Sequence, residues 1–165
     1  MLLYQDESTA LAKNVLRVCE GASLKLATAE SCTGGLIAAY LTDIAGSSSV
    51  IERGFVTYSN EAKNEMLSVP LELINTLGAV SEDVARQMAE GAVQNSRADV
   101  AVSVTGIAGP GGGTKDKPVG LVHMAAAKTG QNTRHERHVF DGDRDSVRQQ
   151  TVVAALQLIL LLIKD

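Results

Sequence analysis

Three serines, Ser47 to Ser49, precede Tyr58 and Lys63 in one short window of the chain. A serine hydroxyl becomes a nucleophile when a nearby base removes its proton, and a lysine can act as that base once burial has lowered its pKa. We therefore predict Ser48 as a nucleophile, Lys63 as its general base, and Tyr58 as a proton relay or a support for the lysine. The alternative is a plain serine turn followed by a solvated Lys63, which the spacing alone does not exclude.

A second polar segment, Thr28–Gly35, joins a predicted strand to a predicted helix. Gly34 and Gly35 open that helix, where unpaired amide N–H groups suit a phosphate or a carboxylate. Glu30 in the same segment could orient a ligand hydroxyl or pair with a neighbouring base. The segment is thus a candidate ligand site, and the alternative is a well-capped turn whose small residues allow close packing.

A third segment, Thr105–Thr114, is rich in glycine and follows a predicted buried strand. Folds of the α/β kind usually place ligands at such strand ends. We predict a flexible loop that encloses the substrate, with Gly109 and Gly111 close to it, although an ordinary long connection is the alternative.

Arg144 and Arg148 lie one turn apart at the start of the predicted last helix. On one helix face they could clamp a phosphate, or they could pair with neighbouring aspartates. Cys32 precedes a helix, which could lower its pKa and make it a nucleophile, but no histidine accompanies it. His123 is isolated in the sequence, and no metal-ligand motif is present, so we predict no metal site.

Composition narrows the class of protein. The 165 residues carry a net charge of −4 without a dense basic stretch, which argues against nucleic-acid binding. The apolar run 152–163 is about half of the roughly 20 residues that a membrane span needs. The opening residues 1–7 lack the features of a signal peptide, and two cysteines are too few for a disulfide framework. We expect a cytoplasmic protein.

Hydrophobic periodicity predicts an alternation of helices and strands within one domain, residues 1–165. The predicted helices cover 8–19 with Ser8 as N-cap, 34–41, a short helix capped by Asn60, 81–95 and 143–163. The predicted strands cover 24–28, 51–58, 99–104, 119–127 and 133–140. The last two strands suggest a hairpin, so we predict an α/β or α+β fold: a three-layer-like sandwich with a mixed sheet and helices on its faces.

Longer motifs allow a more specific hypothesis. In this order along nearly the whole chain, they resemble the CinA C-terminal domain family: 28–35, 54–63, 78–81 and 105–112, with 117–120 and 142–144 also fitting. No molybdopterin-binding-like domain precedes these motifs in the sequence, so we expect the stand-alone form. The resemblance implies hydrolysis of the carboxamide of nicotinamide mononucleotide (NMN) to nicotinate mononucleotide and ammonia, in pyridine nucleotide salvage and without a cofactor.

The resemblance also implies roles for individual residues. Ser48 would be the nucleophile, although Ser47 and Ser49 beside it leave that assignment less specific, with Lys63 as base and Tyr58 in support. The residues implied to bind the substrate or the tetrahedral intermediate are Ser31, Thr105 and Arg144, the last through the phosphate or the ring.

Two other functions remain open from the sequence. One is a catalytically inactive nucleotide-binding or assembly module of the same family, and the other is a Ser–Lys amidase for a different small amide. The apolar last helix makes a homodimer or a higher homo-oligomer the expected assembly.

Overall fold

Five strands form one open sheet in the order β2-β1-β3-β4-β5 in the computed structural model, which describes residues 7–164. The strands are β1 (Leu26–Glu30), β2 (Ile51–Val56), β3 (Val100–Gly106), β4 (Leu121–Lys128) and β5 (Arg134–Val139). β1 runs parallel to β2 and β3, whereas β4 is antiparallel to both β3 and β5. The predicted mixed sheet and its C-terminal hairpin are confirmed. Residues 1–6, on which the expectation of no signal peptide mainly depends, lie outside the described range.

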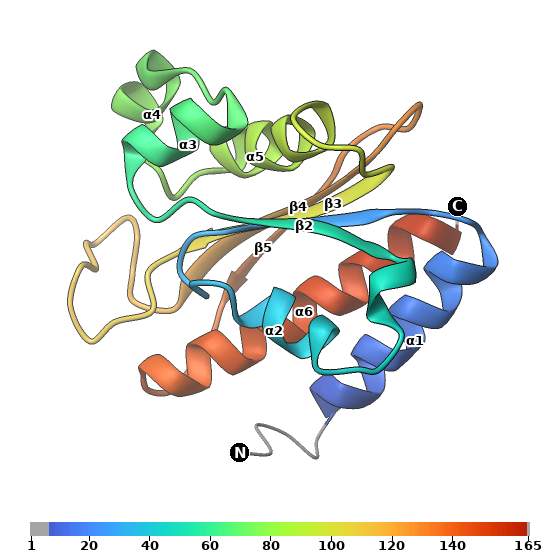
Figure 1. Ribbon diagram of the computed structural model, residues 1–165. Coiled ribbons are helices and arrows are strands. Elements are labelled where there is room, and N and C mark those ends of the chain that lie inside the picture. The colour runs from blue at the N-terminus through green and yellow to red at the C-terminus, as the bar shows by residue number, and fades with distance from the viewer. Residues whose placement is uncertain (1–6, 165) are drawn as a thin grey trace.

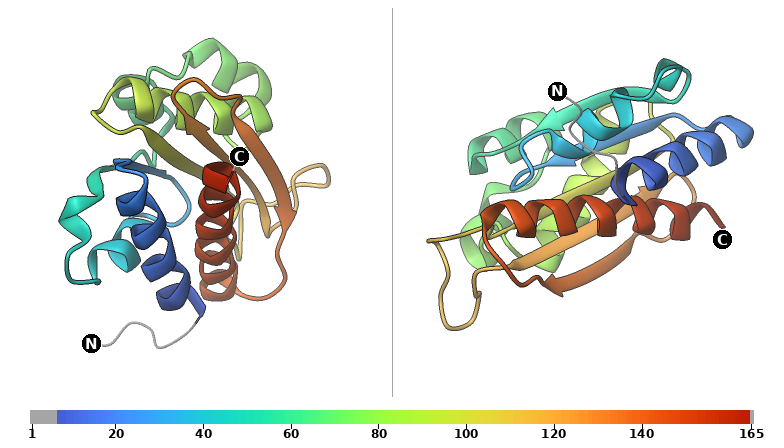
Figure 2. Two further views of the ribbon diagram at one scale, coloured as in Figure 1. Left: turned by 90° about the vertical axis from the view of Figure 1, so that its right-hand side faces the viewer. Right: turned by 90° about the horizontal axis from the view of Figure 1, so that it is seen from below.

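Helices cover both faces of this sheet and make a three-layer sandwich (Figure 1). One layer consists of α1 (Glu7–Gly21), α2 (Leu36–Thr42) and α6 (Arg144–Lys164), and the other of α3 (Asn60–Leu67), α4 (Leu71–Leu77) and α5 (Glu82–Gln94). The two views of Figure 2 show α1 and α6 side by side under the sheet. The fold class is therefore as predicted.

Three local predictions about helix starts and number were wrong. Ser8 lies inside α1 rather than at its N-cap. The N-cap of α3 is Ser59, whose hydroxyl accepts a hydrogen bond from the Ala62 amide at 3.0 Å, and not Asn60. α4, a helix of 7 residues that follows Pro70, was not predicted. Such a short helix has little periodicity of its own and depends on tertiary packing.

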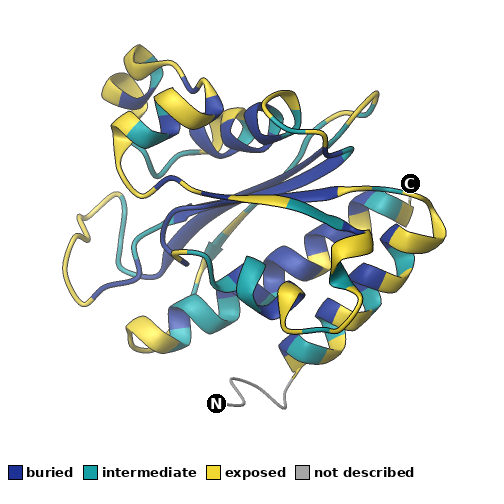
Figure 3. Ribbon diagram, in the orientation of Figure 1, coloured by how far each residue is buried: buried dark blue, intermediate teal, exposed yellow. Residues whose placement is uncertain are grey.

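The central strands carry the core. All five residues of β1 and most of β3 are buried, because helices cover both of their faces (Figure 3). Continuous apolar strands are typical of such doubly covered positions. The α6 helix is long and apolar enough to cross a membrane by length and composition alone, but 56% of that stretch is buried inside the protein. Its apolar surface is therefore used for packing against α1 and the sheet.

Gly91 in α5 fixes how closely α3 approaches. A Cβ at this position would lie 1.9 Å from the carbonyl oxygen of Leu67, at the end of α3. Only glycine permits that distance between the two helices. Because α3 also carries Lys63, this contact helps to set the depth at which the lysine enters the protein.

The sheet topology creates a natural site at the carboxyl ends of β1 and β3. The chain leaves β1 toward β2 on one side, and β3 lies on the other side of β1. In α/β sheets, ligands bind in the crevice outside the strand ends at such a reversal of strand order. Ser31 directly follows β1, and Thr105 lies near the end of β3.

Candidate active site

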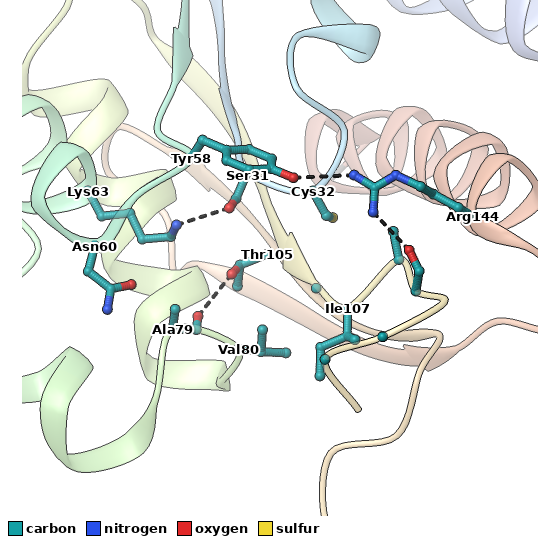
Figure 4. A pocket seen from close by; sticks show the side chains of 15 residues that line it. Ser31, Cys32, Tyr58, Asn60, Lys63, Ala79, Val80, Thr105, Ile107 and Arg144 are labelled. Atoms are coloured by element: carbon teal, nitrogen blue, oxygen red, sulfur yellow. Dashed lines mark hydrogen bonds between the residues drawn. The ribbon is translucent and has the colours of Figure 1, made fainter. Parts of the chain in front are cut away.

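A pocket of about 300 Å³ opens at this edge of the sheet. Its walls come from the segments that follow β1, β2 and β3, from the connection between α4 and α5, and from the start of α6 (Figure 4). The lining residues include Ser31, Tyr58, Lys63, Thr105, Gly109 and Arg144. Segments far apart in the sequence thus meet around one cavity.

Lys63 and Ser31 form the central contact of the pocket. The Lys63 Nζ donates a hydrogen bond to Ser31 Oγ at 3.0 Å (Figure 4). It donates a second hydrogen bond to the Thr57 carbonyl at 2.8 Å. The lysine is only 1% exposed, so the alternative of a solvated Lys63 is wrong. Its burial lowers the pKa of the ammonium group below the ordinary lysine value. The pair has the geometry of a hydroxyl beside a potential base.

The predicted contact between Ser48 and Lys63 is contradicted. Ser48 is exposed in a 3₁₀ turn, η1 (Ser47–Ser49), that comes before β2, whereas Lys63 comes after β2. The six residues of β2 separate these two ends of the strand by roughly 17 Å. Figure 1 shows the η1 turn at the opposite end of the sheet from the loop between β3 and β4. Ser31, which the resemblance had placed only as a substrate contact, takes the position beside the lysine.

The neighbouring serines of η1 serve the packing of that far end. The Ser49 hydroxyl donates to the Glu20 carboxylate at 3.0 Å, and the Ser49 carbonyl accepts from the Lys25 ammonium group. Both partners precede β1: Glu20 lies in the last turn of α1, and Lys25 directly before Leu26. The structure therefore brings none of the three consecutive serines into the pocket that Lys63 lines.

Tyr58 and Arg144 meet at the mouth of the pocket. Arg144 donates one hydrogen bond to the Tyr58 hydroxyl at 3.2 Å and another to the Gly109 carbonyl at 2.9 Å. Tyr58 is 63% exposed and its hydroxyl contacts the arginine, rather than supporting Lys63 as predicted. The arginine thus links the segment after β2 to the loop after β3.

Thr105 lies on the floor of the pocket, and its hydroxyl donates to the Ala79 carbonyl at 2.9 Å. With its proton engaged there, the hydroxyl presents acceptor lone pairs to a ligand. Gly111 lines the pocket as predicted, but Gly34 and Gly35 do not. These two glycines instead adopt left-handed backbone conformations in the turn before α2, with φ of 61° and 103°.

An apolar wall was not anticipated from the sequence. Val80 and Ile107 line the pocket together with Ala79 and Ala108. The motifs at 78–81 and 105–112 marked both segments, but single aliphatic side chains in loops give no periodic signal that separates a ligand contact from ordinary packing.

Cys32 lines the pocket beside Ser31, but its environment is opposite to the predicted one. Burial raises the pKa of the Cys32 thiol to about 12, so the thiolate form is strongly disfavoured. Arg148 does not line the pocket, and it donates to the Thr33 carbonyl at 3.0 Å. Of the two arginines, only Arg144 is placed to contact a ligand there.

His123 and His135 form a separate pair between the sheet and α5. His123 is not isolated, because its Nδ1 lies 2.9 Å from His135 Nε2 and the rings stack. Glu82 and Arg86 of α5 and Arg137 of β5 contribute to the electrostatic environment. Burial, with His135 next in importance, lowers the pKa of His123 to about 4. Among residues 7–164, no group of three or more His, Cys, Asp or Glu side chains is arranged for a metal ion.

Comparison with known proteins identifies the family. The model of the CinA C-terminal domain matches residues 8–163. A putative competence-damage inducible protein of Symbiobacterium thermophilum is 50% identical over 165 residues, and the match covers 95% of this chain but only 39% of that protein. The nicotinamide-nucleotide amidohydrolase PncC of Escherichia coli is 50% identical over 155 residues, 94% of each chain.

The solved structure of the competence/damage inducible protein CihA from Agrobacterium tumefaciens has the same fold. It superposes with a TM-score of 0.95 at 49% identity, and the match covers 100% of both chains. The sequence match and the structural match each extend over almost the entire described chain. The chain belongs to the CinA C-terminal domain family.

Proposed function

We propose that the protein is a hydrolase that converts nicotinamide mononucleotide to nicotinate mononucleotide and ammonia. The observation that carries this proposal is the contact between buried Lys63 and Ser31 inside a pocket. The similarity to the E. coli amidohydrolase over 94% of both chains supports the choice of substrate. The catalytic pair in this proposal is Ser31–Lys63, with Ser31 in place of the Ser48 predicted from the sequence.

The first step is attack on the carboxamide. Neutral Lys63 accepts the proton of Ser31 Oγ, and the oxygen bonds to the carboxamide carbon to give a tetrahedral intermediate. The positively charged pyridinium ring withdraws electrons and makes that carbon more electrophilic. The Thr57 carbonyl, 2.8 Å from Nζ, accepts an N–H of the neutral amine and so directs its single lone pair to the serine.

The second step releases the products. Protonated Lys63 returns its proton to the leaving nitrogen, the carbon–nitrogen bond breaks, and ammonia departs from an acyl-enzyme. Lys63 then takes a proton from water, which attacks the ester carbon and frees Ser31 and the nicotinate group. Water is the only co-reactant, and the lysine is neutral again once the serine recovers its proton.

The remaining pocket residues fit the substrate. The acceptor lone pairs of Thr105 match the N–H groups of the carboxamide, because its own proton is donated to Ala79. Arg144 at the mouth has donors beyond those used by Tyr58 and Gly109, and we assign them to the phosphate. The apolar wall of Val80 and Ile107 suits the flat face of the pyridine ring.

Other properties follow the same proposal. A role in pyridine nucleotide salvage agrees with a cytoplasmic location and with a mononucleotide as the only partner, without nucleic acid or membrane. A homodimer or higher homo-oligomer remains our expectation for the assembly. The alternative functions are an inactive nucleotide-binding or assembly module, suggested by the relatives named only as competence-damage inducible, and a Ser–Lys amidase for another small amide.

Ammonia release from a substrate panel tests this proposal. The purified protein is incubated with NMN, nicotinamide riboside, nicotinamide and NAD, and ammonia is measured with a coupled assay. We expect the highest kcat/KM for NMN, because the assigned phosphate contact at Arg144 is missing from the riboside and from free nicotinamide. Binding of NMN without ammonia release would favour the inactive module, and a preference for a substrate without phosphate would favour another amidase.

A further inference from the structure

Glu30 occupies an unusual position directly before the candidate nucleophile. It is the last residue of β1, is 0% exposed, and precedes Ser31 in the chain. A buried carboxylate is unfavourable unless several donors compensate for its lost hydration. In this protein the compensating donors all belong to the turn and the helix that follow Ser31.

The Glu30 carboxylate accepts hydrogen bonds from several groups of that turn. Its oxygens accept hydrogen bonds from three backbone amides, at 3.2, 3.0 and 2.9 Å, and from the Thr33 hydroxyl. The amides belong to Gly35, Ile37 and Ala38, at the start of α2. The negative charge also matches the positive end of the helix dipole. Glu30 therefore fixes both ends of the connection in which Ser31 lies.

The main chain of Glu30 is also linked to Lys63, through Thr57. Its carbonyl accepts a hydrogen bond from the Thr57 amide at 2.9 Å, and the Thr57 carbonyl accepts from Lys63. On the other side of β1, toward β3, the Ser31 amide donates to the Val104 carbonyl at 3.1 Å. Glu30 is thus linked to the nucleophile Ser31 through the chain, and to the base Lys63 through the hydrogen bonds of Thr57.

We propose that Glu30 is a positioning residue, whose carboxylate holds the turn after Ser31 so that Ser31 Oγ stays in line with Lys63. The inference rests on the proposed function, because it takes Ser31 as the nucleophile and Lys63 as its base. Glu30 does not touch the substrate in this account, since it does not line the pocket. Its effect is therefore on the chemical step rather than on substrate affinity.

Replacing Glu30 by glutamine is the most direct test. The amide nitrogen of glutamine would meet backbone N–H groups where a carboxylate oxygen now accepts, so the turn must shift. We expect kcat for NMN to fall about 10- to 100-fold with KM changed less than about 3-fold, because small misplacements of reacting groups reduce rates that strongly. Amide hydrogen exchange should become faster at Gly35, Ile37 and Ala38.

A matched control separates positioning from loss of stability. Thr151→Ala removes another buried hydrogen bond, from Thr151 Oγ1 to the Val147 carbonyl in α6, away from the pocket. It should lower the melting temperature and leave kcat unchanged at a temperature where both variants are fully folded by circular dichroism. If Glu30→Gln does not fold, Thr33→Val removes one donor to the carboxylate at nearly constant volume, and we expect kcat to fall several-fold at constant KM.

The outcomes are distinguishable. A kcat for Glu30→Gln within about 3-fold of the wild-type value overturns the inference. If Glu30→Gln does not fold, an unchanged kcat in Thr33→Val overturns it instead. A fall in kcat in Thr151→Ala as large as that in the tested variant also overturns it. If wild-type protein releases no ammonia from NMN, the proposed function fails instead, and the exchange measurement alone decides whether Glu30 holds the turn. Unchanged exchange at the three amides would then overturn the inference.

Discussion

The ammonium nitrogen of Lys63, on α3, lies 3.0 Å from the hydroxyl of Ser31, at the end of β1. The two residues are 32 positions apart in the chain, and both side chains are buried. Burial disfavours the charged form of a lysine, and the proposed mechanism uses the neutral amine of Lys63 as its base.

The pH dependence of the rate should report Lys63. Only the neutral amine can accept the serine proton, so kcat/KM should rise as pH increases from mildly acidic to alkaline values. Since burial lowers the pKa of Lys63, the rise should level off below the value of about 10.4 that is typical of lysine. A profile that stays flat from pH 6 to pH 9 would argue against a lysine base.

Lys63→Arg provides a variant that retains the positive charge at this position. A guanidinium stays protonated at all accessible pH values, so it cannot act as the base. We expect kcat to fall by at least about 100-fold, within the range typical for loss of a general base. Activity near that of wild type, measured as ammonia release, would show that a neutral amine is not required.

Arg144 should determine the preference for a phosphorylated substrate. In Arg144→Ala we expect KM for NMN to rise about 10-fold or more, as for loss of a charge-assisted contact, with a much smaller effect on nicotinamide riboside. Arg17→Ala, which removes an exposed arginine on α1 that contacts Asn14, is the charge-matched control. Equal effects on both substrates would mean that Arg144 serves only to hold Tyr58 and Gly109.

Cys32 should be dispensable for the chemistry. Because burial raises the pKa of its thiol to about 12, almost no thiolate is present near neutral pH. We expect Cys32→Ala to retain activity within about 10-fold, and iodoacetamide at pH 8 to label Cys32 in the native protein far more slowly than in the unfolded chain. Complete loss of ammonia release in Cys32→Ala, with the fold intact, would return the thiol to consideration as the nucleophile.

The histidine pair should make stability depend on pH. The pKa of His123 is about 4 in the folded protein and near 6.5 in the unfolded chain, so the unfolded state binds more protons between these values. The stability due to neutral His123 is therefore complete above about pH 6.5 and is lost as pH falls toward 4. The free energy of unfolding, measured with urea at pH 7.5 and pH 5, should differ less between the two pH values in His123→Gln than in wild type. An equal difference in the two proteins would refute the assignment of this pH dependence to His123.

The fold was largely accessible from the sequence because its signals are local. The buried runs of β1 and β3, the amphipathic pattern of α5 and the hairpin of β4 and β5 each lie within one continuous segment. Their order predicted a mixed sheet with helices on its faces. The short helix α4 was missed because 7 residues carry too weak a pattern.

The proposed catalytic pair, Ser31 and Lys63, was not accessible in the same way. Sequence proximity favoured Ser48 as the partner of Lys63. The strand β2 lies between them, however, and places them near opposite ends of the strands. Ser31 reaches Lys63 because β1 and β2 are parallel neighbours, so the segments that follow them meet. That adjacency depends on strand order, which one sequence does not reveal.

Ammonia release from NMN by Ser31→Ala and Ser48→Ala, measured side by side with wild type, tests the central claim most directly. Both variants remove one serine hydroxyl, but Ser31 touches Lys63 and Ser48 lies in the exposed turn before β2. We predict that Ser31→Ala loses activity by at least about 1,000-fold, as expected when a covalent nucleophile is removed, while Ser48→Ala keeps that of wild type. Activity that survives in Ser31→Ala and disappears in Ser48→Ala would contradict the account.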